Sequence, residues 1–124
     1  RLGIRYGLNI GVNTCGKGLR IMHIGSILIN RDARLGENCA LHINTAIVAK
    51  GTTNEAPVLE SGVVVGVGAA VVGGVRGARN VAIGAGAVVT HSIDEENVAV
   101  AGIPARKVSA NGRQNWNKRS IKPE

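Results

Sequence analysis

Three histidines, His23, His42 and His91, are the side chains of this 124-residue chain best suited to move protons near neutral pH. A histidine that takes the proton of a hydroxyl or amine turns that group into a nucleophile, so each is a candidate general base. We expect His23 to be catalytic and His42 to have a catalytic or substrate role, the alternatives being a structural His23 and a surface His42. His91 is expected to be a solvated surface residue. No His, Cys and carboxylate cluster has metal-ligand spacing, so no metal is expected.

A six-residue period organises the part of the chain that must position these side chains. Steps of six from Ile29 meet a branched aliphatic residue at nine of eleven positions, and four residues further on lies a second column of small or aliphatic residues. The eleven positions are Ile29, Leu35, Leu41, Ile47, Thr53, Leu59, Val65, Val71, Gly77, Ile83 and Val89. A period of six is not helical, but it contains the strand period of two. Each hexad therefore predicts a short strand and a bend; three hexads close a triangular coil, and the coils stack by parallel pairing.

The composition agrees with a narrow interior. The chain has 18 Gly, no Phe, and only Tyr6 and Trp116 as aromatic residues, yet 44% of its residues are hydrophobic. This aliphatic content excludes a disordered chain, and no run approaches the ~18 apolar residues of a membrane span. Gly and Asn at the bends should adopt positive φ, as at Asn38, Gly68, Asn80 and Gly86. The alternative, an irregular β-sandwich, would not keep a constant pitch of six.

Both candidate histidines depart from this repeat. His23 stands six residues before Ile29, where the phase predicts an aliphatic residue, so a polar side chain there indicates function. His42 follows Leu41, in the place where other hexads often have glycine. The two histidines are 19 residues apart, one more than a coil of three hexads, so we expect them on nearby faces of successive coils.

The organisation along the chain is predicted as follows. Residues 1–22 form an irregular first coil, residues 23–108 the β-helix, and residues 109–124 a basic tail that is either packed or disordered. The segment 51–57 lacks inward aliphatic residues and is expected to be a loop that replaces one hexad. Because residue 1 is Arg and no signal peptide is visible, the chain is expected to be a piece of a longer protein.

Three stretches resemble the hexapeptide-repeat acyltransferases, and most closely the serine acetyltransferases and their relatives in surface-polysaccharide gene clusters. They are residues 18–29 (GLRIMHIGSILI), 83–89 (IGAGAVV) and 101–106 (AGIPAR). The resemblance implies a left-handed parallel β-helix of about five coils, a homotrimer with sites between subunits, and acetyl-CoA as the acyl donor. The general rule for parallel crossovers would favour the right hand, so the handedness comes from the resemblance alone.

The resemblance also assigns roles to residues. His23 falls where the family has its catalytic histidine, and the polysaccharide-cluster relatives tend to carry a histidine at His42. The positions that match the acetyl-CoA groove between neighbouring prisms are Gly68, Ala69, Ala85, Gly86 and Ala87. At the exit from the repeat, the positions expected to meet the CoA phosphates are Pro104, Arg106 and Lys107.

Some residues depart from the serine enzymes. Met22 stands where they have an aspartate before the catalytic histidine, Leu8 where they have a second aspartate, and Glu55-Ala56-Pro57 where their loop ends in Arg-His-Pro. We therefore expect O- or N-acetylation of a sugar or amino sugar, with Asn44, Asn54 and Glu55 near the acceptor. The alternatives are a serine O-acetyltransferase and a catalytically silent trimeric β-helix that serves as a scaffold or binding module.

The net charge of +7 raises nucleic acid as a partner. Residues 106–124 carry a net +5, whereas the other 105 residues carry only +2. The charge is thus local to the tail, and the chain lacks the aromatic residues on which RNA and single strands stack. No nucleic-acid partner is expected. The two cysteines form no CxxC pair, and they fit a reducing cytoplasm.

Overall fold

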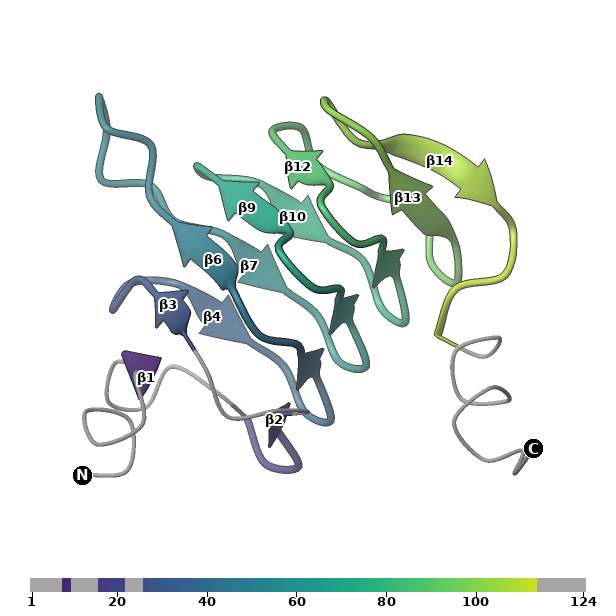
Figure 1. Cartoon of the computed structure of the whole chain (residues 1–124), viewed down its shortest axis with the longest axis horizontal. Coiled ribbons are helices and arrows are strands. Elements are labelled where there is room, and N and C mark those ends of the chain that lie inside the picture. The colour runs from purple at the N-terminus through teal and green to yellow at the C-terminus, as the bar shows by residue number, and fades with distance from the viewer. Residues whose placement is uncertain (1–7, 10–15, 22–25, 114–124) are drawn as a thin grey trace.

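The computed structural model describes residues 8–9, 16–21 and 26–113, and these fold as short strands wound around a three-sided prism (Figure 1). Three sheets form its faces. Sheet A contains β1 (Leu8–Asn9), β3 (Ile27–Ile29), β6 (Thr45–Val48), β9 (Ala70–Val72) and β12 (Val88–Val89). Sheet B contains β4 (Arg34–Leu35), β7 (Val58–Leu59) and β10 (Arg76–Gly77). Sheet C contains β2 (Arg20–Ile21), β5 (Ala40–Leu41), β8 (Val64–Val65), β11 (Ala82–Ile83), β13 (Ala99–Ala101) and β14 (Arg106–Ser109).

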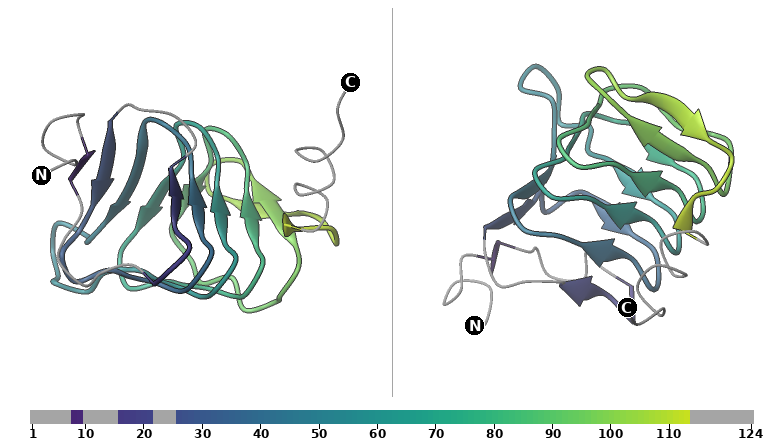
Figure 2. Two further views of the ribbon diagram at one scale, coloured as in Figure 1. Left: turned by 90° about the horizontal axis from the view of Figure 1, so that it is seen from below. Right: turned by 45° about the vertical axis from the view of Figure 1, so that its right-hand side comes forward.

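From β2 to β12 the chain visits sheets C, A and B in turn, and each strand runs parallel to the strand of the previous coil. Between β12 and β13 an isolated parallel bridge from Ile93 to Gly77 takes the place of a strand in sheet B. Figure 2 shows the coils stacked along the prism axis. Only β14 runs antiparallel, beside β13. The architecture is the left-handed parallel β-helix, as predicted. No helix in the described parts of the chain is both long enough and apolar enough to cross a membrane.

The interior is the aliphatic column that the six-residue period predicts. Leu41, Ile47, Val65 and Val71 are completely buried and belong to one hydrophobic cluster. Gly77, which breaks the aliphatic rule, lies against Leu59, and a Cβ atom at Gly77 would come within 2.8 Å of that side chain. The small residue there makes room for its neighbour in the coil below, so the column stays packed.

Bends with positive φ join the faces, as expected. At the corner between sheets B and C, Asn38 and Asn80 adopt φ of 61°. Each asparagine side chain covers a glycine of the preceding coil. A Cβ atom on Gly18 would lie 2.0 Å from Oδ1 of Asn38, and one on Gly62 would lie 2.0 Å from Oδ1 of Asn80. Glycine is needed at both positions because of this contact and because of its own positive φ.

The loop at residues 51–57 is an additional hexad, which corrects the prediction that it replaces one. Across the loop, Arg34 pairs with Val58 and Ala46 pairs with Ala70, so paired residues are 24 apart. Elsewhere in the same sheets the spacing is 18, as between Ile27 and Thr45. The loop protrudes between β6 and β7 (Figure 1). The phase of six survives, but the strands after the loop lie one face later than simple counting suggests.

The phase argument for His23 is also corrected. In sheet C, Ile21 pairs with Leu41, 20 residues further on. Ile21 therefore fills the aliphatic position that counting back by 18 assigns to His23, and it is partly buried against the core. The connection between β2 and β3 is two residues longer than the one between β5 and β6. His23 belongs to that connection and lies outside the described residues.

The segment after β14 folds back along the corner between sheets B and C. The backbone N–H of Gly112 donates to the carbonyl of Asn97, and that of Arg113 donates to the carbonyl of Asn80. A cavity at this corner, lined by Arg20, Asn38, Ser61, Gly62, Asn80 and Arg113, receives the guanidinium group. The predicted basic tail is thus packed as far as Arg113.

Arg113 is buried, with 9% of its surface exposed. Its Nη1 donates to the carbonyl of Asn38 at 2.5 Å and to the carbonyl of Gly62 at 3.2 Å. Burial, followed by repulsion from Arg20, lowers the pKa of Arg113, and burial raises the pKa of the neighbouring Cys39 thiol. The cation therefore joins two coils through their carbonyls rather than facing solvent.

Replacing Arg113 by methionine should lower the free energy of unfolding by about 1–3 kcal/mol, because carbonyls of two coils lose a charged donor. Urea denaturation of the whole chain measures this effect. Arg106→Met, at an exposed position of β14, is the matched control and should change stability by less than about 0.5 kcal/mol. Equal stability of the two variants would show that the Arg113 contacts are not stabilising.

Candidate active site

The connections from sheet C to sheet A stack into one edge of the prism, which we call the C–A edge. In the described residues it consists of residues 42–44, 66–69 and 84–87, and the turn between β13 and β14, residues 102–105, lies at its end. Seven predicted site residues lie there, in three successive coils: His42, Asn44, Gly68, Ala69, Ala85, Gly86 and Ala87. The fold therefore brings the predicted histidine and the predicted acyl-donor positions onto the same edge.

His42 is held at the corner that follows β5. Its backbone N–H donates to the carbonyl of Val65 in the next coil at 3.1 Å, and its side chain is half-buried. Asn44 is exposed, has φ of 60°, and donates its backbone N–H to the carbonyl of Ser26 at 2.6 Å. The corner is thus fixed to the coils on both sides, and it presents an imidazole and an amide at one place.

The next two corners of the edge consist of glycine and alanine, apart from Val67, which is 43% exposed. Gly68 and Gly86 have φ of 72° and 71°, and a Cβ atom on either would meet nothing within 4 Å. Ala69 and Ala87 point inward and are buried, whereas Ala85 is exposed. The backbone of this stretch is consequently open to close approach by an extended ligand.

A cavity of about 330 Å³ joins His42 to this bare stretch. It lies over the outer face of sheet C, and most of its lining is small and aliphatic. The lining residues are His42, Val64, Gly66, Ala82, Ile83, Gly84, Ala85, Ala99, Val100, Ala101 and Val108. His42 and Ala85 therefore belong to one hollow, although they are 43 positions apart in the sequence.

His23, the predicted base, lies outside the described residues. The chain connectivity nevertheless assigns it to the connection between β2 in sheet C and β3 in sheet A. This is the connection that precedes the His42 corner, and its last residue, Ser26, accepts the hydrogen bond from Asn44.

Asn54 and Glu55 are not near His42 within one chain. Both are exposed in the loop between β6 and β7, at the edge where sheet A meets sheet B. The Glu55 carboxylate lies over Gly74, since a Cβ atom on Gly74 would come within 2.6 Å of Oε1. The expectation that these residues share a site with His42 is thus not met by a single protomer.

The exit from the repeat has two different environments. The N–H of Val88 donates to the carbonyl of Gly102, and the N–H of Ala105 donates to the carbonyl of Val88, which places Pro104 at the end of the C–A edge. Arg106 is exposed on β14. Lys107, expected to meet phosphate, instead donates from Nζ to both carboxylate oxygens of Glu95, at 3.2 and 3.0 Å.

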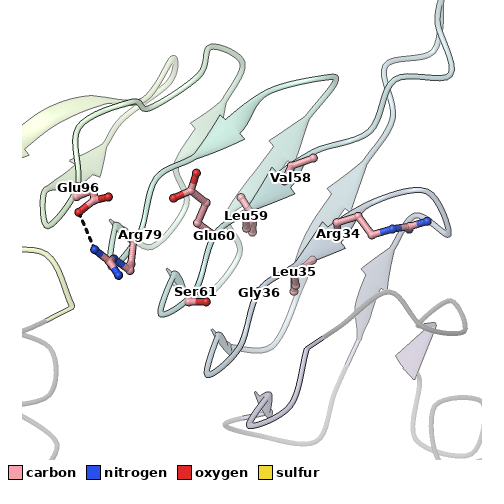
Figure 3. A pocket seen from close by; sticks show the side chains of 9 residues that line it. All are labelled: Arg34, Leu35, Gly36, Val58, Leu59, Glu60, Ser61, Arg79 and Glu96. Carbon is pink, nitrogen blue, oxygen red and sulfur yellow. Dashed lines mark hydrogen bonds and ion pairs between the residues drawn. The ribbon is translucent and has the colours of Figure 1, made fainter.

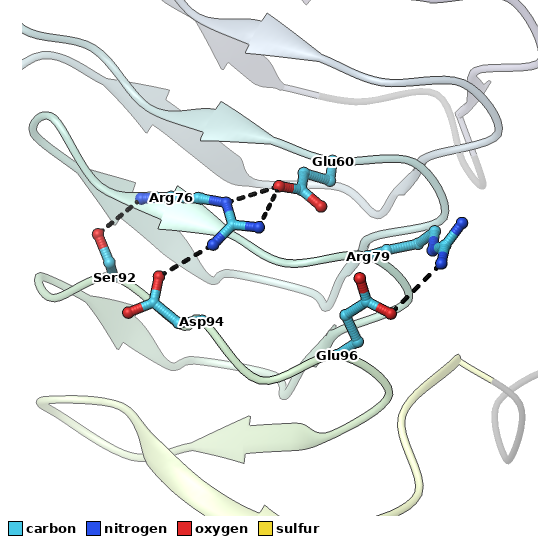
Figure 4. A network of polar contacts seen from close by, with 6 residues as sticks. All are labelled: Glu60, Arg76, Arg79, Ser92, Asp94 and Glu96. Atoms are coloured by element: carbon cyan, nitrogen blue, oxygen red, sulfur yellow. Dashed lines mark hydrogen bonds and ion pairs between the residues drawn. The ribbon is translucent and has the colours of Figure 1, made fainter.

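A cavity of about 600 Å³ lies on a different face of the prism, over sheet B (Figure 3). Its neighbourhood is rich in ion pairs. Arg76 binds the carboxylates of Glu60 and Asp94, and Arg79 lies 3.4 Å from a carboxylate oxygen of Glu96 (Figure 4). The hydrogen bond to Glu60 is the main cause of the raised pKa of Arg76. These charges neutralise one another on an exposed surface, so we assign them no catalytic role.

Two further polar side chains, Thr45 and Arg113, are buried. The sequence could have indicated Thr45, because this residue has a hydroxyl at an inward position where the following coils have Ala69 and Ala87. It offers none for Arg113, whose carbonyl partners lie 75 and 51 positions away. Within the described segments no three His, Cys, Asp or Glu residues converge as a metal site would require.

Known proteins with similar sequence and structure are serine acetyltransferases, although no family model matches the chain. The serine acetyltransferase of Synechococcus elongatus is 33% identical over 99 residues, which make up 78% of this chain and 40% of that protein. The Brucella abortus serine acetyltransferase in complex with coenzyme A is 28% identical with a TM-score of 0.72, covering 80% of this chain and 41% of that one. The Neisseria gonorrhoeae serine acetyltransferase in complex with serine is 26% identical with a TM-score of 0.74, covering 85% and 44%.

The chain spans about two fifths of the length of the relatives that it matches. The match covers most of the repeat, and the fold agrees with the hexads from which the architecture was predicted. The chain is therefore similar to the serine acetyltransferases over most of its repeat, and it has the same left-handed β-helix fold.

Proposed function

We propose that this chain is the β-helix of an acetyl-CoA-dependent acetyltransferase that acts on a small hydroxyl or amino acceptor. The observation that carries the proposal is the C–A edge, where a corner bearing His42 and Asn44 lies in one column with bare glycine corners. An imidazole that can donate or accept a proton thereby lies next to a surface that an extended thioester can approach. The relative from Brucella abortus, which was solved with coenzyme A, supports the same donor.

The residues present fit the acyl donor. The C–A edge offers open space at Gly68 and Gly86 and an exposed alanine at Ala85, so a pantetheine arm would meet backbone and methyl groups. Pro104 ends this edge, and Arg106 is an exposed cation beyond it. Arg106 suits the phosphates of the donor, whereas Lys107 would first have to exchange its contact with Glu95.

His23 serves as the general base in this proposal. It takes the proton of the acceptor, whose oxygen or nitrogen forms a bond to the thioester carbon. The resulting oxyanion needs a donor, and His42 at the neighbouring corner is assigned that role or the orientation of the acceptor. When the carbon–sulfur bond breaks, the protonated histidine returns the proton to the sulfur, so that free CoA and the acetylated acceptor leave.

The position of the loop supports the proposal of a homotrimer with sites between subunits. Asn54 and Glu55 are at the edge between sheets A and B, away from His42, so only a second protomer can bring them to a C–A edge. The family resemblance supports such an arrangement, and we propose that the loop contributes to the acceptor site of the neighbouring subunit.

L-serine is the acceptor favoured by the relatives, which are serine acetyltransferases, one of them solved in complex with serine. A sugar hydroxyl or amino-sugar nitrogen is the second candidate, and it rests on specific residues. Met22 cannot accept a hydrogen bond from an ammonium group as a carboxylate does, and Glu55 would repel the carboxylate of serine.

The test is to measure thiol release from acetyl-CoA with L-serine, free sugars, amino sugars and nucleotide sugars as acceptors. Release with serine alone would support the first acceptor, and release with a sugar alone would support the second. A chain that neither releases thiol with any acceptor nor gains thermal stability from CoA would be a silent scaffold, contrary to the proposal.

Ala85→Glu should weaken CoA binding by about 10-fold or more, because it places an anion where a phosphate-bearing ligand must pass. Val58→Glu is the matched control, since Val58 is 47% exposed on the outer face of sheet B. The measurement is the CoA-dependent rise in melting temperature. Equal loss of CoA binding in both variants would contradict the assignment of the C–A edge.

A further inference from the structure

The His42 corner differs from the two corners that follow it on the C–A edge, although the backbone takes the same course. Three positions of the His42 corner carry polar side chains, whereas the equivalent positions of the next two corners carry none. In register, the equivalent trios are His42, Gly66 and Gly84; Asn44, Gly68 and Gly86; and Thr45, Ala69 and Ala87. The His42 corner thus has histidine, asparagine and threonine at the three positions where the other two corners have glycine, glycine and alanine.

Thr45 is the buried member of this set. It is 3% exposed and occupies the inward-facing column of the prism at the start of β6. Its Oγ1 donates a hydrogen bond to the carbonyl of His42 at 3.0 Å. A hydroxyl is costly in an aliphatic interior unless it is hydrogen-bonded, so this contact explains how the column tolerates Thr45.

At the next two corners the carbonyl equivalent to that of His42 accepts its hydrogen bond from a backbone N–H. There the backbone N–H of Ala69 donates to Gly66 at 3.1 Å, and that of Ala87 donates to Gly84 at 3.2 Å. At the His42 corner a side-chain hydroxyl makes the bond to the carbonyl. The Thr45 hydroxyl therefore adds a contact to the His42 backbone that a single substitution can remove.

We propose that Thr45 is a positioning residue that fixes His42 for acetyl transfer. The His42 peptide is held toward the next coil by its bond to Val65 and across the corner by Thr45, and the bond from Asn44 to Ser26 fixes the same corner to the preceding coil. Two of these bonds are backbone contacts of the ladder, and the third belongs to the side chain. This inference rests on the proposed function of the C–A edge.

Thr45→Val is the test, because valine keeps the branched shape and removes the hydroxyl. We expect kcat to fall about 10-fold or more, since displacement of a catalytic group by ~1 Å can cost 10²-fold, while the KM for acetyl-CoA stays unchanged. The nuclear magnetic resonance signal of the His42 ring, assigned by its loss in His42→Gln, should shift in the variant. Thr45→Ser should restore both kcat and the ring signal.

Thr45→Ala compared with Thr45→Ser repeats the test with two side chains that differ only in the hydroxyl, should the valine variant fail to fold. Wild-type kcat and an unshifted His42 ring signal in a variant without the hydroxyl would overturn the inference. If the wild-type chain transfers no acetyl group, the proposed function fails. The ring signal then still decides whether Thr45 positions His42.

Discussion

Replacing His23 by alanine is expected to lower turnover by roughly 10²–10⁴, the usual contribution of a general base, with CoA binding retained. The reason is chemical, because methyl cannot accept the proton that the attacking hydroxyl or amine must lose. CoA binding should persist because the bare corners at Gly68 and Gly86 lie in later coils of the C–A edge. Steady-state thiol release gives the turnover, and the CoA-dependent rise in melting temperature gives the binding.

His91→Ala is the matched control, since His91 is exposed and lies at the turn after β12, where Oγ1 of Thr90 is 3.1 Å from Nδ1 of its ring. Its turnover should equal that of the wild-type chain. Full activity of His23→Ala would refute His23 as the base. In that case His42, half-buried beside the cavity on the same edge, would be the next residue to test.

The fold could be predicted from the sequence because its physical cause is local and repeated. A prism with a narrow interior accepts an aliphatic residue such as Ile47 or Val71 at each inward position and rejects large aromatic side chains. The handedness could not be predicted in this way. The inward pattern is the same for either hand, and the general preference for right-handed crossovers points in the wrong direction.

The assignment of residues to faces could be predicted only in part. A count of six cannot distinguish a hexad that is replaced from a hexad that is added, because both keep the phase at Leu59. The strand pairing, for example that of Arg34 with Val58, shows that the loop is extra. The two additional residues before β3, by contrast, shift the phase itself, and this is why Ile21, not His23, pairs with Leu41.

The site could be predicted where its members share a column, and not where they depend on distant contacts. His42, Asn44 and Gly68 lie on one edge because the repeat itself aligns them. Lys107 is engaged by Glu95, and Arg113 is buried against carbonyls of much earlier coils. Those contacts depend on how the chain folds back after β13, and no periodic signal in the sequence records that reversal.

Replacing Ile47 by alanine should lower the free energy of unfolding by about 2–5 kcal/mol, the usual cost of truncating a fully buried aliphatic side chain. Ile47 is completely buried in β6, between β3 and β9. Its coil cannot shrink around the cavity, since the ladder on both sides is fixed, for example by the 2.7 Å bond from the N–H of Asn30 to the carbonyl of Ile47. We therefore expect a loss in the upper half of that range.

Urea denaturation of Ile47→Ala, Ile47→Val and Val58→Ala separates cavity formation from other effects. The valine variant should lose about 0.5–1.5 kcal/mol, and Val58→Ala, at an exposed position, should change stability by less than about 0.5 kcal/mol. A loss below about 1 kcal/mol in Ile47→Ala would contradict a rigidly packed interior.

The same cavity should also affect the site. Each coil of a solenoid contacts only its neighbours, so a cavity in β6 weakens the packing between the coil that carries the His42 corner and the coils that carry the glycine corners. Acetyl transfer should consequently be lost at lower urea concentrations in Ile47→Ala than in the wild-type chain.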